Sequence, residues 1–224
     1  MSLLQKPGQA LDRARGQAAT IGPRRRGRGR HFELDGREYR YLVHPYNTTW
    51  RNERTVEIPL ALEALEAHRG RPTLEVGHVT HWYVRGKIEH EVVDKYEVAA
   101  GVRNIDVLDV EAGPRYDLVL AISTLEHVGF DEEVKDLAKP RAAVAHLHAL
   151  LNPGGELLVT IPIGQNPAAD DLFFGEPAFD RMSFLKRRGE EHDWVQATAD
   201  EVRETRYGSP FFAANAVAVG RSRR

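Results

Sequence analysis

The chain has 224 residues, of which 42% are hydrophobic and 29% are charged, and its net charge is −2 at pH 7. These values suit one globular α/β domain with extensions. The lack of cysteine excludes disulfides and thiolate metal sites, and no apolar run approaches the ~18 residues of a membrane span. Since the start also lacks the apolar core of a signal peptide, we expect a soluble, cytoplasmic protein.

Charge is distributed unevenly along the chain. Residues 1–30 hold eight Lys and Arg against one acid, whereas residues 31–220 hold 20 basic against 32 acidic residues. We expect 1–30 to be a basic, flexible arm with a short helix at 9–20; such blocks also serve as tails that bind RNA or an acidic partner. The acidic body repels a phosphate backbone, so nucleic acid is an unlikely partner for the domain itself.

Residues 31–52 precede the predicted core. Phe32 to Val43 alternates loosely around the turn dipeptide Asp35-Gly36, which predicts a hairpin that either caps a sheet edge or covers a ligand. The polar and aromatic residues up to position 52, which show no periodicity, predict a loop. From Glu53 to His68 the apolar spacing predicts a helix, with Pro59 near its first turn.

The rest of the chain, 53–224, alternates strands with helices. Most of the predicted strands are continuous apolar runs, as in parallel sheets covered on both faces. They are Thr73–Gly77, Glu91–Lys95, Asn104–Val110, Tyr116–Ser123, Glu156–Ile163 and Ala214–Arg221. A helix is expected from Pro140 to Leu151, and only a short or irregular one after the first strand. The pattern predicts a doubly wound, mainly parallel sheet with helices on both faces.

One segment, 163–194, matches no core element in this pattern. It follows the fifth strand and therefore enters the region beyond the carboxyl ends of the strands, where α/β folds bind ligands. We interpret it as an insertion that contacts the substrate; the alternative is a helix and loop that cover the sheet.

Two positions indicate a nucleotide-type cofactor. Gly77 ends the first strand and lets the backbone approach a ligand closely. Asp94 ends the second strand seventeen residues later, where an acid accepts hydrogen bonds from ribose hydroxyls.

Five motifs occur in order: Leu74-Glu75-Val76-Gly77, Val93-Asp94, Asn104-Ile105-Asp106, Tyr116 to Val128, and Leu151-Asn152-Pro153-Gly154-Gly155. Together they resemble class I S-adenosylmethionine-dependent methyltransferases over roughly 53–220, and in particular bacterial enzymes that act on sugars and other small molecules. The resemblance implies a seven-stranded Rossmann-like sheet and S-adenosyl-L-methionine as cofactor. It also implies that the loop at the end of 31–52 covers the ligand cleft. The glycine loop of that family usually has two or three glycines, whereas only Gly77 is present here.

The resemblance also implies roles for individual residues. Glu75 would face the amino acid end of the cofactor, Asp94 the ribose and Asp106 the adenine amino group. Further cofactor contacts are expected from the neighbouring loops, at Gly77, His78, Tyr83 and Ser123. For Glu75 and Asp94 the alternative is that a strand-end acid caps the next helix, and Tyr83 could instead belong to the core.

His127 follows the fourth strand at the rim where the methyl group would emerge, and histidine is the natural base for a hydroxyl nucleophile. We therefore predict His127 as general base, with Glu126 beside it to orient or cap; alternatively, His127 only bonds to backbone. The pairs His78/His81 and His146/His148 lack a third ligand, and Asp170-Asp171 could simply be solvated, so no metal site is predicted.

The predicted activity is methyl transfer to a hydroxyl or amine of a small molecule, such as a sugar or natural-product metabolite, by a protein that could form a homodimer. Two alternatives stay open. One is an RNA methyltransferase that uses the basic arm, and the other is a non-catalytic binding protein that keeps the fold.

Overall fold

A computed structural model describes residues 29–84 and 89–224. The predicted arm up to residue 28, with its helix at 9–20, lies outside the described residues. The helices are η1 (Tyr46–Arg51), α3 (Arg54–Ala67), η2 (Thr80–Trp82), η3 (Val107–Asp109), α4 (Lys139–Ala149), α5 (Pro167–Phe174) and α6 (Ala199–Val202). The strands are β1 (His31–Leu34), β2 (Arg37–Arg40), β3 (Thr73–Val76), β4 (Glu91–Val93), β5 (Val102–Arg103), β6 (Tyr116–Ile122), β7 (Leu151–Pro162), β8 (Arg181–Arg187), β9 (Trp194–Ala197) and β10 (Ala216–Arg223).

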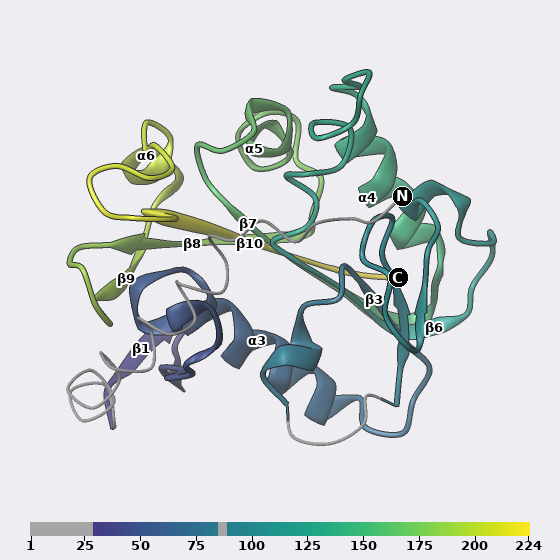
Figure 1. Cartoon of the computed structure of the whole chain (residues 1–224), viewed down its shortest axis with the longest axis horizontal. Coiled ribbons are helices and arrows are strands. Elements are labelled where there is room, and N and C mark those ends of the chain that lie inside the picture. The colour runs from purple at the N-terminus through teal and green to yellow at the C-terminus, as the bar shows by residue number, and fades with distance from the viewer. Residues whose placement is uncertain (1–28, 85–88) are drawn as a thin grey trace, which may run out of the picture.

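The described part of the chain forms an eight-stranded sheet in the order β5-β4-β3-β6-β7-β10-β8-β9 (Figure 1). The five strands from β5 to β7 are mutually parallel, while β10 is antiparallel to both of its neighbours. This order starts in the middle of the sheet and winds outward in both directions, so the predicted doubly wound, Rossmann-like sheet is confirmed. β9 adds an eighth strand at the edge.

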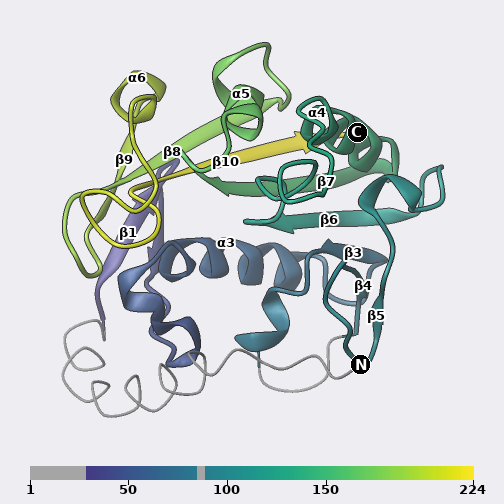
Figure 2. The same cartoon turned by 45° about the horizontal axis from the view of Figure 1, so that its top comes forward.

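Helices cover both faces of the sheet (Figure 2). Val56, Ile58 and Leu60 of α3 pack with Leu118 and Leu120 of β6 on one face. On the other face, α4 and α5 pack on residues of β6 and β7 that alternate with these. Because both faces are covered, β6 is apolar along nearly its whole length, which explains why it was easy to predict.

Pro59 lies inside α3 rather than in its first turn, contrary to prediction. A proline at this position donates no hydrogen bond to the carbonyl four residues earlier. That carbonyl, on Thr55, instead accepts from the backbone N–H of Leu42 at 3.0 Å, and the Thr55 hydroxyl donates to the Leu42 carbonyl at 2.9 Å. Because Pro59 does not use the Thr55 carbonyl, this group can accept the hydrogen bond that attaches the segment at Leu42 to α3.

The predicted hairpin is present, with Asp35 and Gly36 at its turn in the left-handed region. The Asp35 carboxylate accepts from the Ser183 hydroxyl on β8, and its backbone N–H donates to Gln196 on β9. The hairpin thus packs at the β8–β9 end of the sheet, far in the strand order from β3 and β4. This contact agrees with capping of the sheet rather than with covering of a ligand at β3 and β4.

Two strand predictions are wrong. Residues 104–110 form a loop with η3, because the Asn104 side chain bonds to the carbonyls of Asp94 and Glu97 and the Asp106 side chain caps Leu108 N–H. Within 163–194, expected to lack core elements, β8 pairs with both β10 and β9. The charged residues at both ends of β8 obscure its central apolar run in the sequence. None of the helices in 29–84 and 89–224 is long and apolar enough to cross a membrane.

Candidate functional site

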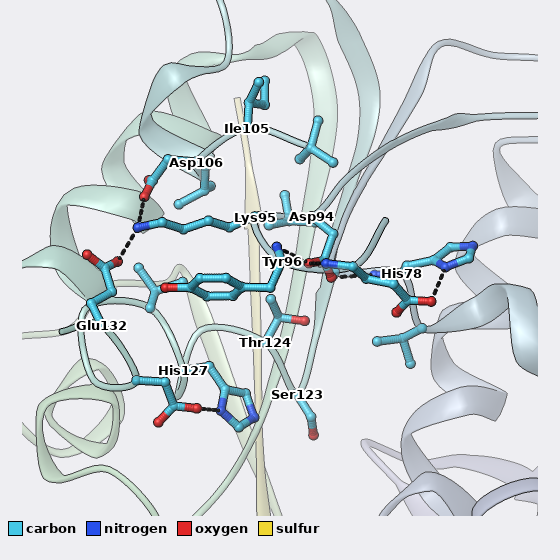
Figure 3. Close-up of a pocket in the computed structure, with 18 residues that line it drawn as sticks. His78, Asp94, Lys95, Tyr96, Ile105, Asp106, Ser123, Thr124, His127 and Glu132 are labelled. Carbon is cyan, nitrogen blue, oxygen red and sulfur yellow. Dashed lines mark hydrogen bonds and ion pairs between the residues drawn. The ribbon is translucent and has the colours of Figure 1, made fainter. Parts of the chain in front are cut away.

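A pocket of about 600 Å³ opens where β3, β4 and β6 end (Figure 3). The carboxyl ends of parallel strands meet at one edge of a doubly wound sheet, and ligands bind there. The pocket is lined by Val76, Gly77, His78, Val79, Val93, Asp94, Lys95, Tyr96, Glu97, Ile105, Asp106, Val107, Ser123, Thr124, His127, Val128, Asp131 and Glu132. Six of the nine residues predicted from the sequence are in this lining: Gly77, His78, Asp94, Asp106, Ser123 and His127.

Gly77 turns the chain from β3 into the pocket with φ of 86°. A Cβ atom at this position would lie 2.2 Å from the hydroxyl oxygen of Thr124, which follows β6. The site therefore requires glycine for two reasons, the backbone conformation and the close approach of the neighbouring loop.

Asp94 organises the loop after β4. Its Oδ1 accepts from the backbone N–H groups of Tyr96 and Glu97, each at 2.8 Å, and its Oδ2 accepts from His78 N–H at 3.2 Å. A carboxylate has about four acceptor positions. One position on Oδ2 is therefore left for a ligand in the pocket.

Asp106 belongs to a cluster of four charges at one end of the pocket, and Figure 3 shows three of them, Lys95, Asp106 and Glu132. It pairs with Lys95 at 2.9 Å and with Lys139, and both lysines also pair with Glu132. Burial alone would raise the pKa of Asp106, but hydrogen bonds from Lys139 and Lys95 outweigh it and lower that pKa to about 2. The cluster ties the loop after β6 to the ends of β4 and α4.

Asp106→Asn is expected to destabilise the fold by about 1–2 kcal/mol at pH 7, allowing for solvent screening of this partly exposed group. The folded-state pKa is lowered, so the stabilisation is present above the ordinary aspartate pKa and is lost as the pH falls towards about 2. Urea denaturation of both proteins between pH 7 and pH 2 measures this effect. A difference that stays constant over this range would contradict the assignment.

His127 forms a pair with Asp131, one helical turn further along the chain. The distance from its Nδ1 to Asp131 Oδ2 is 2.6 Å. Because an ionised carboxylate can only accept, Nδ1 carries a proton, and in the neutral imidazole Nε2 then has the lone pair. Both side chains line the pocket, so the arrangement supplies a proton acceptor at its edge.

Three predicted residues are not in the pocket lining. Glu75 is fully buried, and its carboxylate accepts from Val79 N–H, Thr80 N–H, the Thr80 hydroxyl and His90. It therefore holds the loop after β3, the capping role that was the alternative for a strand-end acid, and does not reach a cofactor directly.

Tyr83 packs in the core beside α3, and burial raises its pKa to about 12. Glu126 is 1% exposed and lies behind the pocket wall, with its Oε1 3.8 Å from His127 Nε2. Tyr83 therefore lies in the core, which was the alternative for it, and Glu126 stays adjacent to the histidine that it was predicted to orient.

His78 does not fill the pocket, since its ring is held at the wall by a contact of 2.9 Å between Nδ1 and Glu97. Trp82 lies outside the lining and stacks on Tyr46 of η1, with ring centroids 4.6 Å apart. Ser123 directly follows β6 and lines the pocket, and its hydroxyl donates to Glu57 of α3 at 2.6 Å.

The adjacent acids Asp170 and Asp171 contact different partners. Asp170 accepts from Gly164 N–H, and Asp171 faces Arg141 at 3.4 Å. Within the described ranges, no group of three or more His, Asp or Glu side chains is arranged to hold a metal ion.

Five pocket residues with side chains suited to binding were missed: Lys95, Tyr96, Thr124, Asp131 and Glu132. Lys95 and Tyr96 directly follow Asp94, so their position after the strand was a usable signal. Asp131 lies four residues after His127, the spacing at which side chains meet on a helical turn. Thr124 and Glu132 had no comparable signal, because they meet other pocket residues through contacts between segments far apart in the sequence.

No family model matches the sequence, and no curated protein matches it. Several solved structures overlap it loosely. The N-methyltransferase NodS from Bradyrhizobium japonicum WM9, in complex with S-adenosyl-L-homocysteine, is 13% identical over 75% of this chain and 85% of that chain, with a TM-score of 0.45. The Burkholderia thailandensis 1,6-didemethyltoxoflavin-N1-methyltransferase is 15% identical over 100% of this chain and 93% of that chain (TM-score 0.41).

The sugar N-methyltransferase KedS8 from Streptoalloteichus sp ATCC 53650 is 13% identical over 77% of this chain and 89% of that chain (TM-score 0.38). Since these overlaps are loose, the fold assignment rests on the strand order and register described above.

Proposed function

We propose that this protein transfers a methyl group from S-adenosyl-L-methionine to a hydroxyl or amine of a small molecule, such as a sugar or natural-product metabolite. The observation that carries the proposal is the shared pocket that Gly77, Asp94 and the His127–Asp131 pair all line. It combines a backbone turn that admits a nucleoside, an acid for ribose hydroxyls and a proton acceptor.

The charge and shape of the pocket suit this cofactor. The remaining acceptor position of Asp94 Oδ2 would bind ribose hydroxyls, which are neutral donors. Ile105, Val107 and the Tyr96 ring give flat apolar surface for an adenine, with Asp106 at the rim. The cofactor supplies an activated methyl group, and the protein aligns it with the acceptor in a water-poor pocket.

His127 would act as general base. Asp131 holds the Nδ1 proton, so Nε2 can take the proton that the acceptor loses as it attacks the methyl carbon. In this view Asp131 is a positioning residue. Glu126 lies outside the pocket lining, with its Oε1 3.8 Å from Nε2.

Asp94→Asn is expected to weaken S-adenosylhomocysteine binding by about 10–100-fold, because a charged hydrogen bond contributes roughly 1.5–3 kcal/mol. Asn keeps an oxygen for the turn at Tyr96 and Glu97, so the fold should survive. Thermal stabilisation by S-adenosylhomocysteine measures the effect, since it reports the affinity for the folded state.

The control is Asp200→Asn, the same change at an exposed position in α6. It should be stabilised by the ligand as much as the unaltered chain. Equal stabilisation of the Asp94 variant, or none in the unaltered protein at millimolar ligand, would contradict the proposal.

A further inference from the structure

Three glutamates and one arginine gather behind the pocket wall that carries Ser123 and His127. Glu57 is fully buried; its Oε2 accepts from Arg54 and its Oε1 from the Ser123 hydroxyl, each at 2.6 Å. Glu53, 8% exposed, accepts from Ala214 N–H at 3.0 Å. With Glu126 this makes three carboxyl groups and one guanidinium, which we call the acidic floor.

Glu126 comes from a different element than the other members and is incompletely bonded. Its Oε2 is buried and has no hydrogen-bond partner among the described residues. Its Oε1 is 3.8 Å from His127 Nε2, too far for a hydrogen bond. Buried polar atoms are rarely left without a partner, and each such atom costs about 1–3 kcal/mol. The acidic floor therefore lacks a donor beside the base.

A cation is the donor that would satisfy Oε2 in the ionised form of Glu126. Burial, with Glu57 and Glu53 close by, raises the pKa of Glu126 well above its ordinary range, and burial also raises the pKa of Glu53. Arg54 is already paired with Glu57. Arg187, which also interacts with the charge of Glu53, donates its guanidinium hydrogen bonds to backbone carbonyls. A second positive charge would let Glu126 ionise and would complete its hydrogen bonds.

We propose that the methyl acceptor is an amine, whose ammonium group binds at the acidic floor through Glu126 next to His127. This inference rests on the proposed function and narrows its acceptor class. A hydroxyl would offer one neutral donor, whereas an ammonium offers three donors and the charge that the floor lacks.

The transfer balances with the groups present. The bound ammonium gives one proton to His127 Nε2 and becomes a neutral amine. Its nitrogen lone pair forms the N–C bond with the methyl carbon as the C–S bond breaks, and the sulfur keeps that electron pair. The products are an N-methylammonium, protonated His127 and the thioether form of the cofactor.

The test compares D-glucosamine with D-glucose, which differ by an ammonium in place of a hydroxyl. Ligand-detected NMR is run on the full chain saturated with S-adenosylhomocysteine. We expect glucosamine to bind at least about tenfold tighter than glucose, and the preference to shrink to about threefold or less in Glu126→Gln, which keeps the shape and removes the charge. Glu176→Gln, the same change at an exposed position, should keep the preference.

Two results would overturn the inference. One is the absence of any preference for the amine in the unaltered chain, which does not depend on how the variant folds. The other is a preference that persists in Glu126→Gln. Calorimetry with S-adenosylmethionine and S-adenosylhomocysteine distinguishes failure of the amine inference from failure of the proposed function. If the unaltered chain binds neither compound, the proposed function itself is wrong. If Glu126→Gln weakens the binding of S-adenosylmethionine but not of S-adenosylhomocysteine, the acidic floor recognises the sulfonium of the cofactor, and the inference about the acceptor is wrong.

Discussion

His127→Ala is expected to lower kcat by about 10²–10⁴-fold, the usual contribution of a positioned general base. Cofactor affinity should be largely retained, because Gly77 and Asp94 follow β3 and β4, whereas His127 follows β6. The measurement is acceptor-dependent formation of S-adenosylhomocysteine, followed with D-glucosamine as acceptor, together with calorimetry of the cofactor.

Two comparisons make the result specific. His31→Ala removes an exposed imidazole from the hairpin and should leave kcat unchanged. Asp131→Ala leaves the imidazole free to rotate and should cost less than the loss of the ring itself. A His127 variant as active as the unaltered chain would exclude the histidine as base and would leave the proton to another acceptor.

Gly77→Ala is expected to abolish measurable cofactor binding and to destabilise the fold. The left-handed backbone costs a residue with a Cβ roughly 1–2 kcal/mol. The overlap with Thr124, where the new atom would lie 2.2 Å from Oγ1, adds to this cost and pushes the two pocket loops apart. Urea denaturation and calorimetry with S-adenosylhomocysteine measure the two effects.

Gly101 provides a matched control. Its φ is 85°, almost the same as at Gly77, but a Cβ there would meet nothing within 4 Å. Gly101→Ala should therefore show the conformational cost alone and keep cofactor binding. In addition, Thr124→Ala should recover part of the loss in the Gly77 variant, because it removes the hydroxyl. Equal losses in Gly77→Ala and Gly101→Ala would show that the contact with Thr124 has no role.

The sequence predicted the parallel half of the sheet well because its strands carry a local signal. β3, β4 and β6 are short apolar runs that end in an acid, a glycine or a serine, and such runs become strands wherever both faces are covered. The positions of Gly77, Asp94 and His127 at one edge then follow from topology alone. Their shared pocket is the consequence of parallel strands ending together.

The remaining features depend on contacts between distant segments, which no local pattern reports. β8 was missed because Arg181 and Arg187 flank its apolar centre, and the strand is defined by its partners β10 and β9. Glu75 has the position of a ligand-binding acid, yet its oxygens are taken by its own following loop. The acidic floor joins Glu57 to Ser123 across 66 positions.

The most direct measurement is a crystal structure of the full chain with saturating S-adenosylhomocysteine. The predicted result is density for a nucleoside beside Gly77, with its ribose hydroxyls on Asp94 and its sulfur pointing towards His127. An empty pocket at saturating ligand, or a nucleoside bound elsewhere on the molecule, would contradict the account.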